Sequence, residues 1–171
     1  MIIVMSDSHG DRNIVEEIKN KYQSQASAII HCGDSELSSD DNIWNGITVV
    51  AGNCDFDSGY KDYQILETDG KKVLVTHGHL AGVNFGLDRL NYLADEEDAD
   101  IVLFGHLHRP ILEQTEGKIF INPGSVSQPR GEFSDKMYCK IDLSQNGYHI
   151  QYLDTNHKPI KELEFQISYD R

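Results

Sequence analysis

The segment that sets the fold reads Ile2-Ile3-Val4-Met5-Ser6-Asp7-Ser8-His9, an apolar run that ends in polar residues. Four consecutive apolar residues are typical of a strand buried on both faces of a sheet. Residues 11–22 follow with apolar side chains at helical spacing and predict an amphipathic helix. Residues 28–31 form a second apolar run, which completes a strand–helix–strand unit. This order favours parallel pairing of the two strands.

The rest of the chain predicts more strands, a second helix and two hairpins. Turn signals at residues 69–70 and 144–147 separate the strands of the hairpins. We therefore expect an α/β fold with mixed sheets and outer helices, as a single domain over residues 1–171, a length that fits one domain. The further expected strands are residues 47–51, 63–68, 72–76, 100–104, 118–121, 137–143, 148–154 and 160–167, and the expected helix is 87–97.

The composition is globular and strongly acidic. With 15 Lys and Arg against 28 Asp and Glu, the formal net charge is −13. This charge argues against long nucleic acid and membranes as partners, because both are bound through clustered basic side chains. A small phosphate ester stays open as a substrate, since bound metal ions can invert the local charge. The sequence shows neither a signal-peptide pattern nor a disulfide-like cysteine pattern, and we expect a cytoplasmic protein.

Polar residues of the same kind follow five of the expected buried strands. Ligands of open α/β sheets bind beyond the carboxyl ends of strands, so we expect these side chains to meet at one rim. Imidazole, carboxylate and amide groups suit a divalent transition-metal ion, and they are too numerous for one ion. Two ions that share a carboxylate form the clamp used in phosphoryl chemistry. The five segments are Asp7-Ser8-His9, Gly33-Asp34, Gly52-Asn53-Cys54-Asp55, His77-Gly78-His79 and Gly105-His106-Leu107-His108.

Each of these motifs taken alone is a weak signal. Gly-Asp is mostly a turn, and His31, inside a buried run, is expected to be a core histidine and not a ligand. His149 and His157 are expected at the surface with no role. The joint occurrence of the motifs, in order, at successive strand ends is what favours a functional site.

Together the motifs resemble the calcineurin-like metallophosphoesterase superfamily. The residues that carry the resemblance are Asp7-x-His9, Gly33-Asp34, Gly52-Asn53-x-Asp55, His77 and Gly105-His106-x-His108. Residues 52–55 and 122–130 further resemble the YfcE-type phosphodiesterase branch, which is related to the scaffold subunit of the eukaryotic retromer. The resemblance implies two mixed β-sheets packed as a sandwich with helices on the outer faces. It also implies a dinuclear phosphodiesterase, in which a hydroxide bridging two metal ions attacks a small phosphodiester.

The resemblance assigns the site residues. Asp7, His9 and His108 would hold the first ion, Asn53, His77 and His106 the second, and Asp34 would bridge them. Among the ions that fit, we expect Mn²⁺, with Ni²⁺, Fe²⁺ or Zn²⁺ as alternatives. The expected catalytic residues are Asp34, Asn53, Cys54 and Asp55.

Cys54 is a departure from the wider family, because many members have histidine at this position. A thiol of ordinary pKa, about 8.5, would be a weak proton donor for the leaving group, or the side chain would only fill space. Asp55 would orient a neighbouring histidine or cap the turn. His79 would support the metal-bound histidines or touch the phosphate, and Arg130 would meet a phosphate. Ser125 and Ser127 are expected to be structural.

Two further functions stay open at this point. One is a protein-binding scaffold that keeps the fold with a vestigial or regulatory metal site, as the retromer relative suggests. The other is a phosphomonoesterase, since nothing in the sequence separates monoesters from diesters. A homodimer through an exposed edge strand is open as well.

Overall fold

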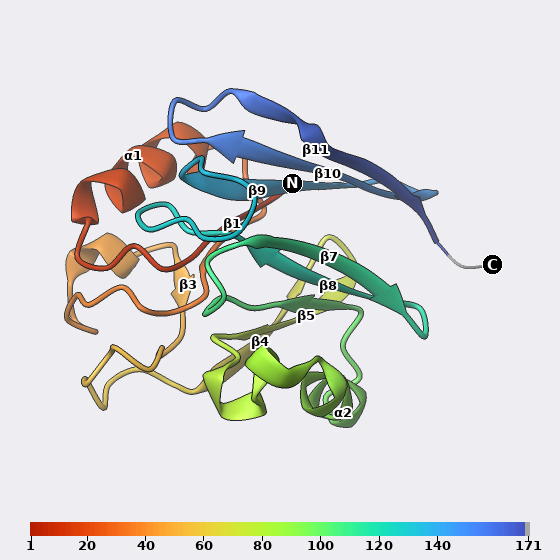
Figure 1. Cartoon of the computed structure of the whole chain (residues 1–171), viewed down its shortest axis with the longest axis horizontal. Coiled ribbons are helices and arrows are strands. Elements are labelled where there is room, and N and C mark those ends of the chain that lie inside the picture. Colours follow the sequence, from red (N-terminus) through yellow and green to blue (C-terminus); the bar gives the residue numbers. More distant parts are fainter. Residues whose placement is uncertain (170–171) are drawn as a thin grey trace.

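Two β-sheets pack face to face in the computed structural model, which describes residues 1–169, and helices cover their outer faces (Figure 1). This arrangement confirms the expected sandwich of mixed sheets. Figure 1 shows α1 over the first sheet and α2 below the second. The first sheet contains, in spatial order, β11 (Pro159–Ser168), β10 (Gly147–Asp154), β9 (Met137–Leu143), β1 (Ile2–Met5), β2 (Ala28–His31) and β3 (Thr48–Val49).

The second sheet has five strands in the described residues. Its parallel centre is flanked by two antiparallel hairpins, one at each edge. In spatial order the strands are β4 (Tyr63–Thr68), β5 (Lys71–Thr76), β6 (Ile101–Leu103), β8 (Lys118–Pro123) and β7 (Pro110–Thr115).

The strand–helix–strand unit forms as expected at the start of the chain. β1 pairs with β2 in parallel, with Ile2 opposite Ala28 and Met5 opposite His31. Between them lies α1 (Arg12–Tyr22), which begins where the Asp11 carboxylate accepts a hydrogen bond from the Ile14 amide. This side-chain cap satisfies one of the amides left free at a helix start.

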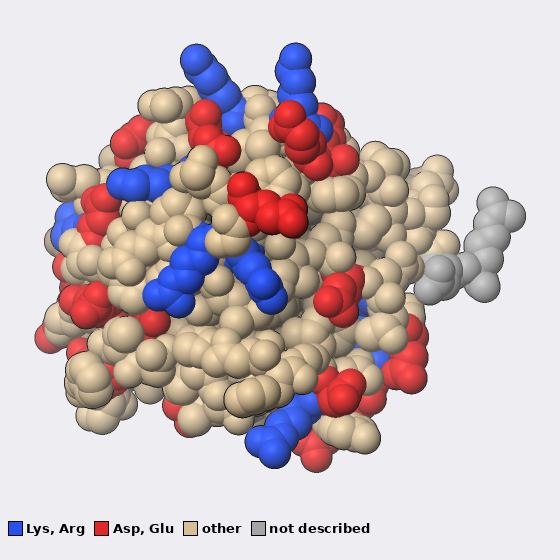
Figure 2. Space-filling model, viewed as in Figure 1, with Lys and Arg blue, Asp and Glu red and all other residues tan. Residues whose placement is uncertain are grey.

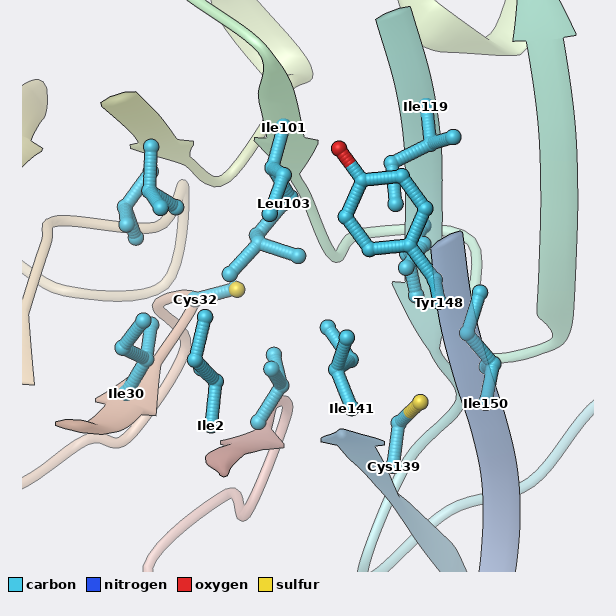
Figure 3. Packing of buried hydrophobic residues seen from close by; sticks show 14 of the residues in the cluster. Ile2, Ile30, Cys32, Ile101, Leu103, Ile119, Cys139, Ile141, Tyr148 and Ile150 are labelled. Atoms are coloured by element: carbon cyan, nitrogen blue, oxygen red, sulfur yellow. The ribbon is translucent and has the colours of Figure 1, made fainter. Parts of the chain in front are cut away.

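The main core lies between the two sheets (Figure 3). Ile2, Ile30 and Ile141 of the first sheet point toward Ile101 and Leu103 of the second, and all five are buried. Burying aliphatic side chains of this size stabilises the fold by roughly 1.5–3 kcal/mol each. This shared core fixes the two sheets against each other, and with them the loops at the strand ends.

Two smaller clusters attach the helices to the outer faces. α1 buries Ile14, Val15 and Ile18 against the first sheet. α2 (Asp88–Glu96) buries Leu90 and Ala94 against the second. Three short 3₁₀ helices lie in the connections: η1 (Asn42–Trp44), η2 (His79–Ala81) and η3 (Val83–Phe85).

The structure differs from the sequence-based prediction at two places. β7 was not predicted, yet it forms a hairpin with β8 around Glu116 and Gly117, both of which have positive φ. The strand expected at 47–51 is reduced to Thr48–Val49, because its neighbours turn into the loop toward Gly52. Among the described helices, none is both long and apolar enough to cross a membrane.

The edge strand β11 is irregular, which bears on the expected dimer contact. Gln151 pairs with Glu164 and Leu153 with Pro159, so the residues between Pro159 and Glu164 bulge out of register. Bulges on edge strands hinder pairing with a second sheet. A dimer through this strand stays a prediction, and the bulge argues against that particular contact.

Candidate metal centre

The predicted site residues meet where strand ends of both sheets come together. Hydrogen bonds tie the loops to one another: the Asp7 amide donates to the Gly33 carbonyl at 3.0 Å, and the His9 amide donates to the Asp34 carbonyl at 3.0 Å. The His106 amide donates to Asp7 Oδ2 at 3.2 Å, which joins the second sheet to the first. The expected convergence at one rim therefore includes loops from two sheets, not from one.

The backbone at the site is left-handed at several residues that are not glycine. The φ angles of these residues lie between 43° and 71°. For residues with a Cβ this region is sparsely populated and costs of the order of 1–3 kcal/mol each. The residues are Asp7, His9, Asp34, Glu36, His106 and His108. Five of the six are predicted metal ligands, and Glu36 is the exception.

The first group of side chains contains Asp7, His9, Asp34 and His108. One ligand atom from each lies within 4.8 Å of the others. Asp7 Oδ1 is 3.0 Å from His108 Nε2 and 3.9 Å from His9 Nε2. The two imidazole nitrogens lie 3.2 Å apart. This set corresponds to the predicted first site together with the shared carboxylate.

The second group contains Asp34, His77 and His106. His77 Nε2 lies 3.2 Å from Asp34 Oδ2. Asn53 Oδ1 lies 3.0 Å from both His77 Nε2 and His106 Nδ1. Asp34 thus belongs to both groups, as the predicted bridging role requires. That these residues bind metal stays a prediction.

One buried oxygen gives a direct test of whether metal ions fit here. Asp7 is fully buried, and its Oδ1 has no hydrogen-bond partner among the described residues. Around this oxygen lie Nε2 atoms of His108, His77 and His9, at 3.0, 3.8 and 3.9 Å. A buried carboxylate oxygen without a partner is costly. A metal cation bound by this oxygen and the three imidazole nitrogens would compensate the free-energy cost of burying the carboxylate. The set of donor atoms is therefore suited to a metal ion.

Outer contacts hold the rings of His77, His108 and His9 so that Nε2 faces inward, whereas His106 turns its Nδ1 toward Asn53. His77 Nδ1 lies 2.7 Å from the Cys32 carbonyl, and His108 Nδ1 lies 2.7 Å from the Gln128 carbonyl. Because a carbonyl only accepts, each Nδ1 must carry the proton. His9 Nδ1 lies 2.9 Å from the Glu36 carboxylate. Such contacts fix the tautomer and orientation of metal-bound histidines.

The electrostatics of the site favour positive charge at its centre. Burial opposes ionisation of Asp34, but the hydrogen bond and charge of His77 outweigh it and hold the pKa of Asp34 below its usual range. Burial likewise opposes a charged His77, but Asp34 and Asp7 raise the pKa of His77 overall. The carboxylates therefore stabilise a proton or another cation at this position.

Asp55 organises the loops and does not face the centre of the site. Its Oδ2 accepts hydrogen bonds from the amides of Asp34 and Gly52, each at 2.7 Å. Its Oδ1 accepts from the Glu36 amide at 2.8 Å. The structure thus favours turn capping over the alternative in which Asp55 orients a histidine.

Cys54 lies beside the bridging carboxylate, with its amide donating to Asp34 Oδ1 at 2.8 Å. Partial burial and the nearby charge of Asp34 raise the pKa of the Cys54 thiol to about 11. The pKa is thus higher than the ordinary value assumed from the sequence. The thiol is neutral at pH 7 and is a poor proton donor there.

The remaining predicted positions have varied surroundings. The His79 ring packs edge-on against His77 with centroids 5.3 Å apart, and its buried Nδ1 lacks a partner in residues 1–169. The buried Ser125 hydroxyl donates to the Asp7 carbonyl at 2.8 Å, as expected for a structural serine. Arg130 is exposed, and its amide donates to the His108 carbonyl.

Two of the histidines predicted to have no role in the site contact other polar side chains. His31 is fully buried, as predicted, and Ser8 Oγ lies 2.9 Å from its Nε2. His157 is half-buried and contacts the exposed Glu17 at 2.9 Å, away from the predicted site.

Sequence reasoning did not identify two residues that shape the site, and for two glycines of the predicted motifs the structure gives the reason. Glu36 and Asn84 contact the rings of His9 and His106. Gly52 and Gly105 leave no room for a side chain, because a Cβ would collide with the carboxylates of Asp34 and Asp7. The glycines beside each predicted ligand were a usable signal for close approach. Nothing in the sequence around Glu36 indicated its contact with the His9 ring.

Comparison with known proteins agrees with this geometry. The family model described as "Calcineurin-like phosphoesterase superfamily domain" matches residues 1–146. The Bacillus subtilis (strain 168) protein named "Probable metallophosphoesterase YsnB" is 35% identical over 167 residues, which cover 98% of each chain. A "Phosphodiesterase YfcE" of Escherichia coli (strain K12) is 35% identical over 94 residues, 50% of this chain and 47% of that protein.

A solved structure shares the whole fold. It is described as a conserved uncharacterized protein, a predicted phosphoesterase, from Streptococcus pneumoniae TIGR4. The TM-score is 0.96 at 42% sequence identity, over 98% of this chain and 96% of that one.

Proposed function

Because the chain belongs to the calcineurin-like phosphoesterase superfamily, we propose that it is a dinuclear metal-dependent phosphodiesterase for small substrates. The observation that carries this proposal is the unpartnered, fully buried Asp7 Oδ1, around which three imidazole nitrogens converge. The shared position of Asp34 supports two ions over one. The finer assignment to diesters is supported by the YfcE relative, which matches over half of this chain.

The residues divide into two ligand sets. Asp7, His9 and His108 would hold one ion, His77, His106 and Asn53 the other, and Asp34 both. Two bound divalent ions would offset the charge of the phosphoryl oxygens and make hydroxide available near neutral pH. The donor set contains oxygen and nitrogen atoms but no thiolate, which suits Mn²⁺. We therefore propose Mn²⁺ as the bound metal, ahead of the other divalent ions.

This chain's own residues set the geometry. The Asp55 carboxylate holds the amides of Asp34 and Gly52 and so fixes the bridging carboxylate. Carbonyls of Cys32 and Gln128 orient His77 and His108. With a neutral thiol beside Asp34, Cys54 gives the leaving group little help, so esters of acidic alcohols should react fastest.

The formal net charge of −13 favours small substrates over long nucleic acid. On the face shown in Figure 2, Lys and Arg side chains are interspersed with Asp and Glu and do not form a continuous basic stripe. A nuclease acting on long strands would need such a stripe.

The test is hydrolysis of bis(p-nitrophenyl) phosphate and p-nitrophenyl phosphate by metal-stripped protein, with Mn²⁺, Ni²⁺, Fe²⁺, Zn²⁺ or Mg²⁺ added singly. We expect metal-dependent turnover of the diester, and a loss to below about 1% of wild type in Asp34→Asn, since even outer contacts of metal ligands are worth 10–100-fold. Asp142→Asn, on β9, is the matched control and should keep full activity. Metal-bound protein that hydrolyses neither ester would contradict the proposal and favour the scaffold function. Faster hydrolysis of the monoester would favour the phosphomonoesterase.

A further inference from the structure

A pocket of about 490 Å³ opens directly beside the second group of metal-site residues. We call it the side pocket; it is lined by Asn53, Asp55, Phe56, Asp57, Asp62, His79 and Leu80, among others. It shares Asn53 with the site, and Asn53 Oδ1 lies 3.0 Å from ring nitrogens of His77 and His106. A phosphodiester held at the metal centre would therefore place one ester arm at this pocket. The volume suits a small organic group.

The charge of the side pocket is negative. Asp55, Asp57 and Asp62 lie in its wall, and none of its described lining residues is Lys or Arg. Asp55 and Asp57 are held by backbone amides: Asp57 accepts from Ser39 and Gly59 at 2.7 and 2.8 Å. Asp62 is exposed and shows no side-chain hydrogen bond in the described residues. An arm with a carboxylate or a further phosphate would be repelled here.

Apolar surface is the second, independent feature of the side pocket. Phe56 is 96% exposed and Leu80 is 63% exposed, although both are large hydrophobic side chains. An ester arm that enters the side pocket therefore has apolar surface to contact as well as carboxylates. Aromatic faces next to carboxylates bind ammonium groups, whose carbon atoms contact the ring while the positive charge is attracted to the acids.

We infer that the side pocket takes an ester arm that carries a positively charged amino group, so that the substrates are zwitterionic diesters of amino alcohols. The inference rests on the proposed phosphodiesterase function. Such a diester has no net charge, because the ammonium balances the phosphate. It therefore approaches a protein of formal net charge −13 without net repulsion, unlike a nucleotide or a polyphosphate.

The experiment compares three p-nitrophenyl phosphodiesters that differ in the second arm. One arm is choline, the second is 3,3-dimethylbutyl, which replaces the nitrogen of choline by carbon, and the third is 3-carboxypropyl. We expect kcat/KM for the choline ester to exceed that of its carbon isostere about tenfold, and the anionic ester to be the poorest. The preference should shrink as salt is raised. Inhibition by phosphocholine against 3,3-dimethylbutyl phosphate checks the same preference without the nitrophenyl ring.

Two variants locate the preference. Asp62→Asn should reduce the ratio between the choline ester and its isostere by about threefold, through the loss of one nearby charge. Glu162→Gln removes one charge on the edge strand β11 and should leave the ratio unchanged.

The outcomes separate the two proposals. If the neutral isostere is hydrolysed but the choline ester and phosphocholine show no advantage, the inference is wrong and the proposed function stands. If bis(p-nitrophenyl) phosphate is hydrolysed but none of the three esters is, the inference is wrong and the proposed function stands. If the metal-loaded protein hydrolyses neither bis(p-nitrophenyl) phosphate nor any of the three esters, the proposed function is wrong and the inference fails with it.

Discussion

Replacing Gly52 by alanine should disable the metal centre by displacing the Asp34 loop, while the core between the two sheets still forms. A Cβ at this position would lie 2.7 Å from Cγ of Asp34, and closer still to Asp34 Oδ1 and the Asp34 amide. Ordinary contacts begin at 3.4 Å, so Cγ of Asp34 must move by at least about 0.7 Å, and the Asp34 backbone must shift as well. Metal–ligand distances are held to within about 0.2 Å. The shift is several times that tolerance and should displace the shared ligand from both ions.

The expected loss is at least 100-fold in affinity for Mn²⁺, or about 2.7 kcal/mol, because even contacts outside the ligand shell are worth 10–100-fold. Isothermal titration calorimetry of metal-stripped protein measures it directly, and thermal unfolding shows whether the fold is kept.

Gly59→Ala is the matched control. A Cβ there would also collide with a neighbouring residue, through Oγ and Cβ of Ser39, but Ser39 is not among the metal-site residues, so the adjustment leaves Asp34 in place. We expect its metal affinity to equal that of wild type. If Gly52→Ala binds two Mn²⁺ ions as tightly as Gly59→Ala does, the reasoning about Asp34 is refuted.

Three more predictions follow from the contacts of single residues. Glu36→Gln removes the charge 2.9 Å from His9 Nδ1 and should weaken Mn²⁺ binding by about 10–100-fold in the same titration, and an unchanged affinity would contradict a positioning role. Cys54→Ala should change hydrolysis of p-nitrophenyl diesters at pH 7 less than about threefold, since the thiol pKa is about 11; a larger loss would show that the thiol takes part. Burial lowers the pKa of His31 to about 4, below the unfolded value of about 6.5, so protonation favours the unfolded chain. The unfolding free energy of metal-stripped protein should therefore fall by up to about 3 kcal/mol from pH 6.5 to 4, and urea titrations of His31→Gln should show a smaller fall over that range.

The sequence predicted the parts of the fold that local patterns encode. The apolar runs Ile2–Met5 and Ala28–His31 became the parallel centre of the first sheet. β7 escaped prediction because Pro110–Thr115 starts with proline and lacks clean alternation; its pairing with β8 makes it a strand.

The site was predictable as a set of ligand types, but its outer contacts were not. Glycine next to Asp34 and His106 indicated where backbone and side chains crowd together. The role of Glu36 depends on a left-handed backbone angle of 55°, which a glutamate does not signal. Likewise, the direction of the Asp55 carboxylate follows from a loop shape that the sequence motif leaves open.

The left-handed backbone of the strand-end loops implies a conflict between activity and stability. At about 1 kcal/mol each, the six residues together cost roughly 6 kcal/mol, as much as the entire stability of many small proteins. A descendant freed from catalysis would gain stability by replacing Glu36 or His9 with glycine, which adopts such angles without strain. Substitutions that remove these residues would therefore raise the free energy of unfolding while abolishing the site. A protein that retains them does so at a cost in stability.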